Sequence, residues 1–128
     1  MMEEFPAVQV RSWLDGQPAS NLFTTSVTQA EILYGIEIMP HGRRRAALAL
    51  AAREVFSERF GDRILAFGSE ASFLFAELSA SRRRAGRPIS QFDCQIAAIT
   101  RLHDAVLATR DTSGFADCGL RLIDPWGQ

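Results

Sequence analysis

Hydrophobic positions along the chain alternate between short apolar runs and longer segments in which apolar residues recur three and four positions apart. The short runs are typical of buried strands, and the longer segments are typical of amphipathic helices. Strands are predicted over 21–27, 63–67, 105–109 and 120–124. Helices are predicted over 6–15, 28–39, 43–60, 70–85, 90–103 and 112–117.

Strands that alternate with helices predict an α/β fold with parallel pairing and helices covering the sheet. The length of 128 residues favours one domain over 1–128. Only four strands are predicted, and the chain opens on a helix, although folds of this class normally begin with a central strand. In such sheets ligands bind beyond the carboxyl ends of the strands, so polar residues at those ends are candidates for function.

Composition narrows the class of protein. Hydrophobic residues make up 47% of the chain, yet no segment has the length and apolar character of a membrane span. The beginning, "MMEEFPAVQVRSW", is acidic and unlike a signal peptide, so a soluble cytoplasmic protein is expected. Cys94 and Cys118 lack the spacing of a zinc site and are expected to be free thiols. All 14 basic residues are arginine, which excludes any mechanism that needs a lysine.

The arginines are clustered, although the net charge is only −1. There are two clusters, and each contains a triplet: Arg43–Arg44–Arg45 and Arg82–Arg83–Arg84. The second cluster also contains Arg87. One interpretation is that they are solvated helix ends, where cations suit the helix dipole only at the C-terminal end. The other is that they contact phosphates or a partner protein. The sequence does not choose between these two interpretations.

Two acids lie near predicted helix starts. Glu31 is one turn into the helix that follows the first strand, and Thr28 stands three residues before it, which is capping-box spacing. Asp93 lies three residues after Ser90, again the pattern of a capped helix start. Asp93 shares a helix face with apolar residues, whereas a capping acid more often points to water, so its pattern favours a functional role.

A third acid, Asp111, directly follows the predicted strand 105–109. It is either a ligand-binding acid at the end of a strand or the N-cap of a short helix over 112–117. Carboxylates that converge repel one another unless a cation neutralises them. Oxygen ligands suit Mg²⁺ or Mn²⁺, ions that polarise a phosphodiester and activate a water molecule. Convergence of Glu31, Asp93 and Asp111 therefore predicts nuclease chemistry.

Four stretches resemble the PIN-domain ribonucleases, above all the VapC and FitB-like toxins of type II toxin–antitoxin modules. They are "VTQAEILYGIEIMPHGRRR", "AGRPISQFDCQIAAI", "ATRDTSGF" and "LRLIDPW". The resemblance implies a three-layer α/β/α fold with a short parallel sheet, and a Mg²⁺- or Mn²⁺-dependent endoribonuclease. It assigns metal coordination and orientation of the attacking water to Glu31, Asp93 and Asp111, with Thr109 in support.

The same resemblance implies partners and exposes a departure. The implied partners are an RNA substrate and a small DNA-binding antitoxin, in a homodimer or a toxin–antitoxin hetero-oligomer. The family opens on a central strand ending in an L-D-T-N type motif, which this sequence lacks. We therefore expect either a start codon that has been placed too late or a truncation. Either would weaken metal binding, and the chain as given is expected to be either active or inactive as a nuclease. The alternatives are a non-catalytic PIN module that only binds its antitoxin and a phospho-receiver, which the absence of lysine argues against.

Overall fold

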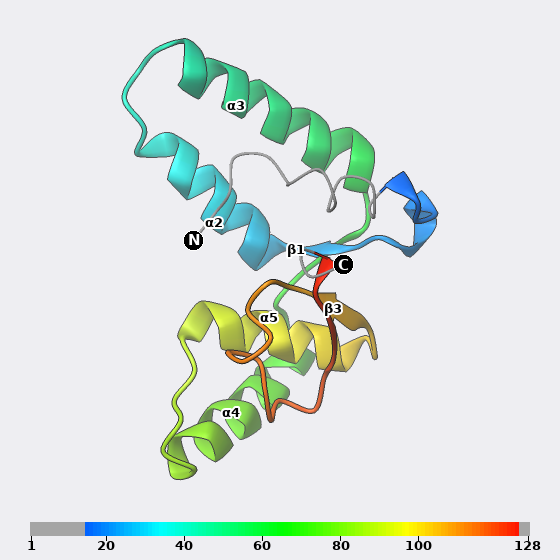
Figure 1. Ribbon diagram of the computed structural model, residues 1–128, viewed down its shortest axis with the longest axis vertical. Coiled ribbons are helices and arrows are strands. Elements are labelled where there is room, and N and C mark those ends of the chain that lie inside the picture. The colour runs from blue at the N-terminus through cyan, green and yellow to red at the C-terminus, as the bar shows by residue number, and fades with distance from the viewer. Residues whose placement is uncertain (1–14, 126–128) are drawn as a thin grey trace. The chain divides into compact units, whose positions relative to one another are not determined.

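The computed structural model describes residues 15–125, and the predicted helix 6–15 lies outside this range except for Asp15. The chain divides into two compact units, Met1–Leu65 and Ala66–Gln128. The first unit contains the 3₁₀ turn η1 (Ala19–Asn21), β1 (Thr24–Thr25), α2 (Ser26–Glu37), α3 (Arg43–Glu54), the π-helical segment η2 (Val55–Phe60) and β2 (Ile64–Leu65) (Figure 1). The second contains α4 (Ser69–Arg84), α5 (Gln91–Leu102), β3 (Val106–Ala108) and β4 (Arg121–Ile123).

The core of the first unit lies between α2 and α3. Leu48, Ala52 and Phe56 are spaced four residues apart, so they share one helix face, and they are buried with Ile36 of α2. The apolar spacing in the helix predicted over 43–60 predicts one buried face, made up of Leu48, Ala51, Ala52, Val55 and Phe56. Of these, Ala51 is half-buried and Val55 is exposed. The two helices pack as a hairpin that carries β1 and the parallel strand β2 beside it.

The start of α2 differs from the predicted capping box. Thr25 is the N-cap residue, and its side-chain oxygen accepts a hydrogen bond from the backbone N–H of Thr28 at 2.9 Å. Thr28 therefore lies inside the helix and caps nothing, so the predicted pairing of Thr28 with Glu31 is wrong. The reason is that two threonines lie one turn apart, and the extended backbone of Thr25 suits the N-cap position.

The predicted helix 43–60 is helical throughout, but its hydrogen bonding changes along its length. It is α-helical over Arg43–Glu54 and π-helical over Val55–Phe60. The backbone N–H of Gly61 donates to the carbonyl of Phe56, five residues earlier, at 3.2 Å. Gly61 has a φ of 55°, which ends the helix in a conformation that glycine adopts without strain.

The second unit is built on the packing of α4 against α5. The buried residues of α5 are small or β-branched, so the two helices approach closely; they are Cys94, Ala97, Ala98, Ile99 and Thr100. Ser69, which directly precedes the helix predicted over 70–85, is expected from its residue type to be the N-cap. Gly68 occupies the N-cap position of α4 instead, so this prediction is wrong. Gly86 has a φ of 74° just past the end of α4, as predicted for a glycine that terminates a helix.

Strands β3 and β4 pair in parallel, with Leu107 opposite Leu122. The short helix predicted over 112–117 is not formed, because the chain makes a series of turns there. Asp117 and Gly119 have φ values of 62° and 74°, and this left-handed backbone is incompatible with a continuing right-handed helix.

The predicted α/β class and the parallel pairing are confirmed. The sequence predicted one short sheet, whereas the strands of residues 15–125 form two separate pairs, β1 with β2 and β3 with β4. The strands are also shorter than predicted, at two or three residues each. No helix within residues 15–125 is both long enough and apolar enough to cross a bilayer.

Truncation of a core leucine tests the α2–α3 core. Leu48→Ala should lower the free energy of unfolding by about 2–5 kcal/mol, because it removes a side chain that is only 7% exposed and leaves a cavity. Leu50→Ala is the matched control, since Leu50 lies on the same helix and is 56% exposed. Urea denaturation measures both, and equal losses for the two variants would contradict the assigned core face.

Candidate functional site

Glu31 lies in the second turn of α2 and is exposed. Because Thr25 rather than Thr28 caps the helix, Glu31 lies six residues after the N-cap and does not have the spacing of a capping box. Glu31 is therefore a carboxylate on the surface of the first unit.

Asp93 lies in the first turn of α5, where a carboxylate is favoured by the helix dipole. The side-chain oxygen of Ser90 accepts a hydrogen bond from the Asp93 backbone N–H at 3.2 Å, which confirms Ser90 as the predicted cap. The Asp93 side chain is half-buried, and its carboxylate makes no hydrogen bond or ion pair with any residue of 15–125. The Ser90 cap thus fixes the backbone of Asp93, while the Asp93 carboxylate has no partner among residues 15–125.

Asp111 lies on the turn that follows β3. The hydroxyl oxygen of Thr109 accepts the backbone N–H of Asp111 at 3.1 Å, and the Thr109 N–H donates to the carbonyl of Ile123 at 2.9 Å. Oδ1 of Asp111 accepts the backbone N–H of Gly114 at 2.9 Å and, over a longer distance of 3.4 Å, the hydroxyl of Ser113. One carboxylate oxygen is thus tied to the backbone, although no helix follows as the N-cap interpretation required.

Arg82 secures this turn from the inside of the unit. It is only 7% exposed, and its Nη1 donates to the carbonyls of Gly114 and Ala116 at 3.1 and 3.0 Å. Its Nε donates to the carbonyl of Arg87 at 2.7 Å. The prediction that Arg82 contacts RNA or a partner protein is therefore wrong, because its buried guanidinium binds backbone carbonyls of its own chain. Sequence reasoning missed this role, since neighbouring arginines in a triplet look alike.

The remaining arginines differ in what they contact. Arg45 donates to the carbonyl of Ile36 at 3.2 Å and pairs with Glu37 at 3.3 Å, so it ties the start of α3 to the end of α2. Arg87 pairs with the exposed carboxylate of Asp117.

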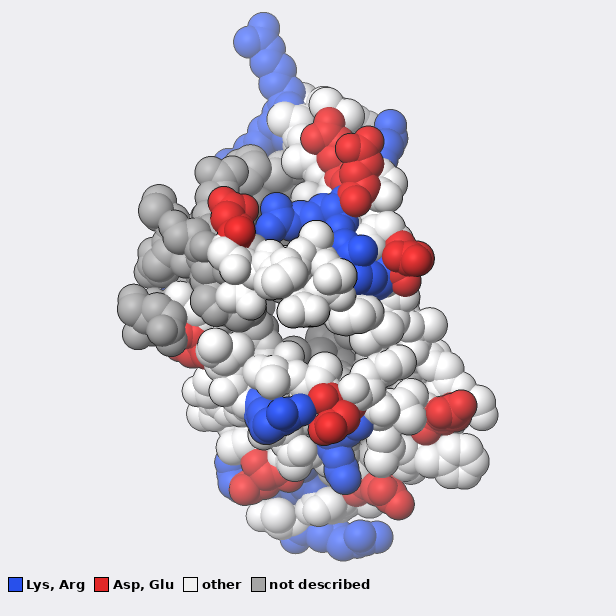
Figure 2. Space-filling view, turned by 90° about the vertical axis from the view of Figure 1, so that its right-hand side faces the viewer, with Lys and Arg blue, Asp and Glu red and all other residues white. Residues whose placement is uncertain are grey.

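Arg43, Arg83 and Arg84 are exposed, and their side chains make no hydrogen bond or ion pair with any of the described residues. Arg44 is also exposed. On the face drawn in Figure 2, arginine and acidic side chains are interspersed rather than gathered by sign. This face therefore has no broad positive patch, and any phosphate binding there would depend on a few neighbouring arginines.

Cys94 and Cys118 are buried free thiols, as predicted. Burial raises the pKa of the Cys94 thiol, the nearby Cys118 raises it further, and Arg82 opposes this rise. Cys94 therefore remains a neutral thiol at neutral pH and is not a reactive thiolate.

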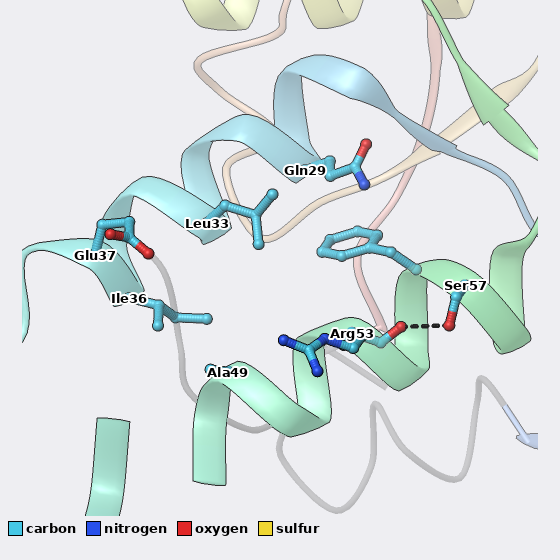
Figure 3. A pocket seen from close by; sticks show the side chains of 8 residues that line it. Gln29, Leu33, Ile36, Glu37, Ala49, Arg53 and Ser57 are labelled. Carbon is cyan, nitrogen blue, oxygen red and sulfur yellow. Dashed lines mark hydrogen bonds between the residues drawn. The ribbon is translucent and has the colours of Figure 1, made fainter. Parts of the chain in front are cut away.

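A groove of about 400 Å³ runs between α2 and the helix formed by α3 and η2. Its lining is mostly apolar, with Glu37 and Arg53 as its charged members, and the hydroxyl of Ser57 donates to the Arg53 carbonyl at 2.6 Å (Figure 3). None of the predicted acids lines this groove, so it is distinct from the candidate carboxylate site.

Within residues 15–125, no three His, Cys, Asp or Glu side chains are grouped closely enough to hold a metal ion. Glu31 belongs to the first unit, whereas Asp93 and Asp111 belong to the second, so the grouping of all three stays a prediction. The donor chemistry fits a hard divalent cation, since Asp93 and the second oxygen of Asp111 offer carboxylate oxygens without competing partners in the described range.

Comparison with known proteins assigns the family. A family model described as PIN domain matches residues 3–119, which include Glu31, Asp93 and Asp111. The phospho-receiver alternative is excluded by this match.

Three curated relatives each match 121 residues, or 94% of this chain. The plasmid stability protein StbB of Pseudomonas syringae pv. tomato is 36% identical, with 87% of its length covered. The VapC ribonuclease Y4jK of Sinorhizobium fredii is 35% identical, with 86% covered. The toxin FitB of Neisseria gonorrhoeae is 26% identical, with 87% covered.

Two solved structures share the fold at 26% sequence identity. The FitAcB crystal structure from Neisseria gonorrhoeae has a TM-score of 0.88, over 97% of this chain and 89% of that chain. The structure of FitAB bound to an IR36 DNA fragment has a TM-score of 0.87, over 94% of this chain and 85% of that chain.

Replacement of Arg82 tests its structural role. Arg82→Gln should lower the free energy of unfolding by about 1–3 kcal/mol, because it removes the buried charged donor that binds the carbonyls of Arg87, Gly114 and Ala116. Arg83→Gln changes the neighbouring residue in the same way on the exposed side of α4 and should stay within about 0.5 kcal/mol of the unmodified chain. Thermal and urea unfolding measure both. Equal effects of the two substitutions would contradict the assignment.

Proposed function

The chain belongs to the PIN-domain family, and on this premise we propose that it is a Mg²⁺- or Mn²⁺-dependent endoribonuclease toxin of a type II toxin–antitoxin module. The observation that carries the proposal is that the family match includes Glu31, Asp93 and Asp111 in a chain 35% identical to a VapC ribonuclease. The toxin FitB supports the toxin assignment over the same length of chain.

The carboxylates of Glu31, Asp93 and Asp111 would hold the cation. When bound, a divalent ion of this kind polarises a phosphodiester and favours deprotonation of an attacking water molecule. Asp93 presents its carboxylate from the first turn of α5, a place fixed by the Ser90 cap. Asp111 presents its second oxygen from the turn after β3, while Thr109 fixes the backbone at the start of that turn. No side chain is required to act as a covalent nucleophile.

The proposed partner is a small antitoxin that binds DNA. Its support is the similarity of the chain to solved FitAB and FitAcB structures, one of them bound to a DNA fragment. The proposed assembly is a homodimer or a toxin–antitoxin hetero-oligomer, and a cytoplasmic location would give the protein access to RNA.

A non-catalytic PIN module that only binds its antitoxin is the competing function. The observation in its favour is that no three candidate ligands are grouped within residues 15–125. Titration with Mn²⁺ separates the two, because a non-catalytic module has no saturable site for the ion.

Neutral substitution of the acids tests the nuclease. Asp93→Asn, Asp111→Asn and Glu31→Gln should each lower Mn²⁺-dependent cleavage of a mixed RNA substrate by on the order of 100-fold or more, because ion-derived charge stabilisation amounts to several kcal/mol. Initial rates of cleavage and calorimetric titration with Mn²⁺ are the two measurements.

The matched control for these variants is Asp104→Asn. Asp104 is an exposed acid of the second unit that pairs with Arg121 at 3.3 Å and lies outside the candidate site. It should keep both Mn²⁺ affinity and cleavage. If the three site variants cleave RNA as fast as Asp104→Asn, the proposed function is wrong.

Charge reversal of Arg83 and Arg84 tests phosphate contact. The pair Arg83→Glu and Arg84→Glu should weaken RNA binding and reduce the slope of affinity against salt by about 1.4, at roughly 0.7 for each phosphate contact on a single strand. The control pair is Arg59→Glu with Arg121→Glu, which makes the same change in net charge at residues already paired with Asp15 and Asp104. Equal slopes for the two pairs would assign Arg83 and Arg84 to another role.

A further inference from the structure

The Asp111 carboxylate lies directly against the backbone of Gly114. The Gly114 N–H donates to Oδ1 at 2.9 Å. A Cβ atom added to Gly114 would lie 2.2 Å from Oδ2 and 2.9 Å from Oδ1 of Asp111. These separations are shorter than any stable contact between carbon and oxygen, so a side chain at 114 and the observed position of the carboxylate exclude each other.

Backbone conformation does not explain the glycine at this position. Gly86 and Gly119 have a φ of 74°, where a side chain would be strained. Gly114 is not among the residues with positive φ, so the backbone at 114 would accept an alanine. The atoms that a Cβ would meet there belong to the exposed end of the Asp111 side chain, so a side chain at 114 would displace the carboxylate from its observed position.

The peptide groups around Gly114 are themselves fixed. The Gly114 carbonyl accepts Nη1 of the buried Arg82 at 3.1 Å, and the same nitrogen reaches the Ala116 carbonyl at 3.0 Å. A buried guanidinium needs such acceptors, and Arg82 also donates its Nε to the Arg87 carbonyl at 2.7 Å, so the turn is held to α4 by charge-assisted hydrogen bonds from one side chain. The N–H that meets Asp111 is thus presented by a restrained segment.

We propose that Gly114 is a positioning residue that places the Asp111 carboxylate for a divalent cation. Its N–H holds Oδ1, its missing side chain leaves room for Oδ2, and Oδ2 remains available as a ligand oxygen. The inference rests on the proposed function, in which Asp111 binds the ion. Hydrogen bonds of this kind to a ligating carboxylate typically change metal affinity by 10–100-fold when they are lost.

A double-mutant cycle without metal tests the contact itself. The melting temperatures of the full-length chain, Gly114→Ala, Asp111→Ala and the double variant are compared by differential scanning calorimetry. Gly114→Ala should lower the melting temperature of the unmodified chain and have no such effect in the Asp111→Ala background, where the colliding carboxylate is absent. An equal decrease in both backgrounds would overturn the proposal.

Titration with Mn²⁺ tests the consequence for the ion. Gly114→Ala should bind Mn²⁺ about 10–100-fold more weakly than the unmodified chain. Gly68→Ala is the matched control, because a Cβ at Gly68 would meet no atom within 4 Å, and it should retain full Mn²⁺ affinity. Electron paramagnetic resonance of bound Mn²⁺ reports the ligand set independently of RNA cleavage.

The two proposals fail in different ways. If the unmodified chain binds no Mn²⁺, the proposed function is overturned and with it any role of Gly114 toward the ion. If the unmodified chain binds Mn²⁺ and Gly114→Ala binds it equally well, only the inference about Gly114 is overturned.

Discussion

The burial of one positive charge is the constraint on which the second unit depends. Arg82 brings a guanidinium into the protein interior, and a buried charge is tolerated only when strong acceptors surround it. The chain supplies carbonyls from Arg87, Gly114 and Ala116, so the end of α4 and the turn after β3 are joined through a single side chain. The place of Asp111 follows from this arrangement, because its carboxylate is bound to the same turn.

The candidate acids are held in two different ways. Asp93 depends on a helix start, where the Ser90 cap fixes the backbone and the helix dipole favours a negative charge, while its carboxylate makes no contact within the described residues. Asp111 depends on a turn, and one of its oxygens is tied to a peptide N–H. Under the proposed function, Asp111 would be a preoriented ligand, and the Asp93 carboxylate would adjust to the geometry of a bound ion.

Much of the fold follows from local patterns in the sequence, and the rest depends on contacts between distant residues. The helical spacing of Leu48, Ala52 and Phe56 identified a core face, and Ser90 was recognisable as a cap. The turn over 112–117 was not, because its left-handed residues and its long-range hydrogen bonds have no periodic signature. Arg82 could not be distinguished from its neighbours for the same reason, since only the tertiary fold shows which arginine of a triplet points inward.

The π-helical segment Val55–Phe60 has a consequence for how the chain tolerates changes in length. A π-turn spans one residue more than an α-turn between hydrogen-bonded groups, as the Gly61 to Phe56 bond illustrates. Each π-turn in this segment therefore contains one more residue than an α-turn does. Removal of one amino acid from its exposed side can be absorbed by conversion to α-geometry, so a single-residue deletion is less disruptive here than within α2 or α3.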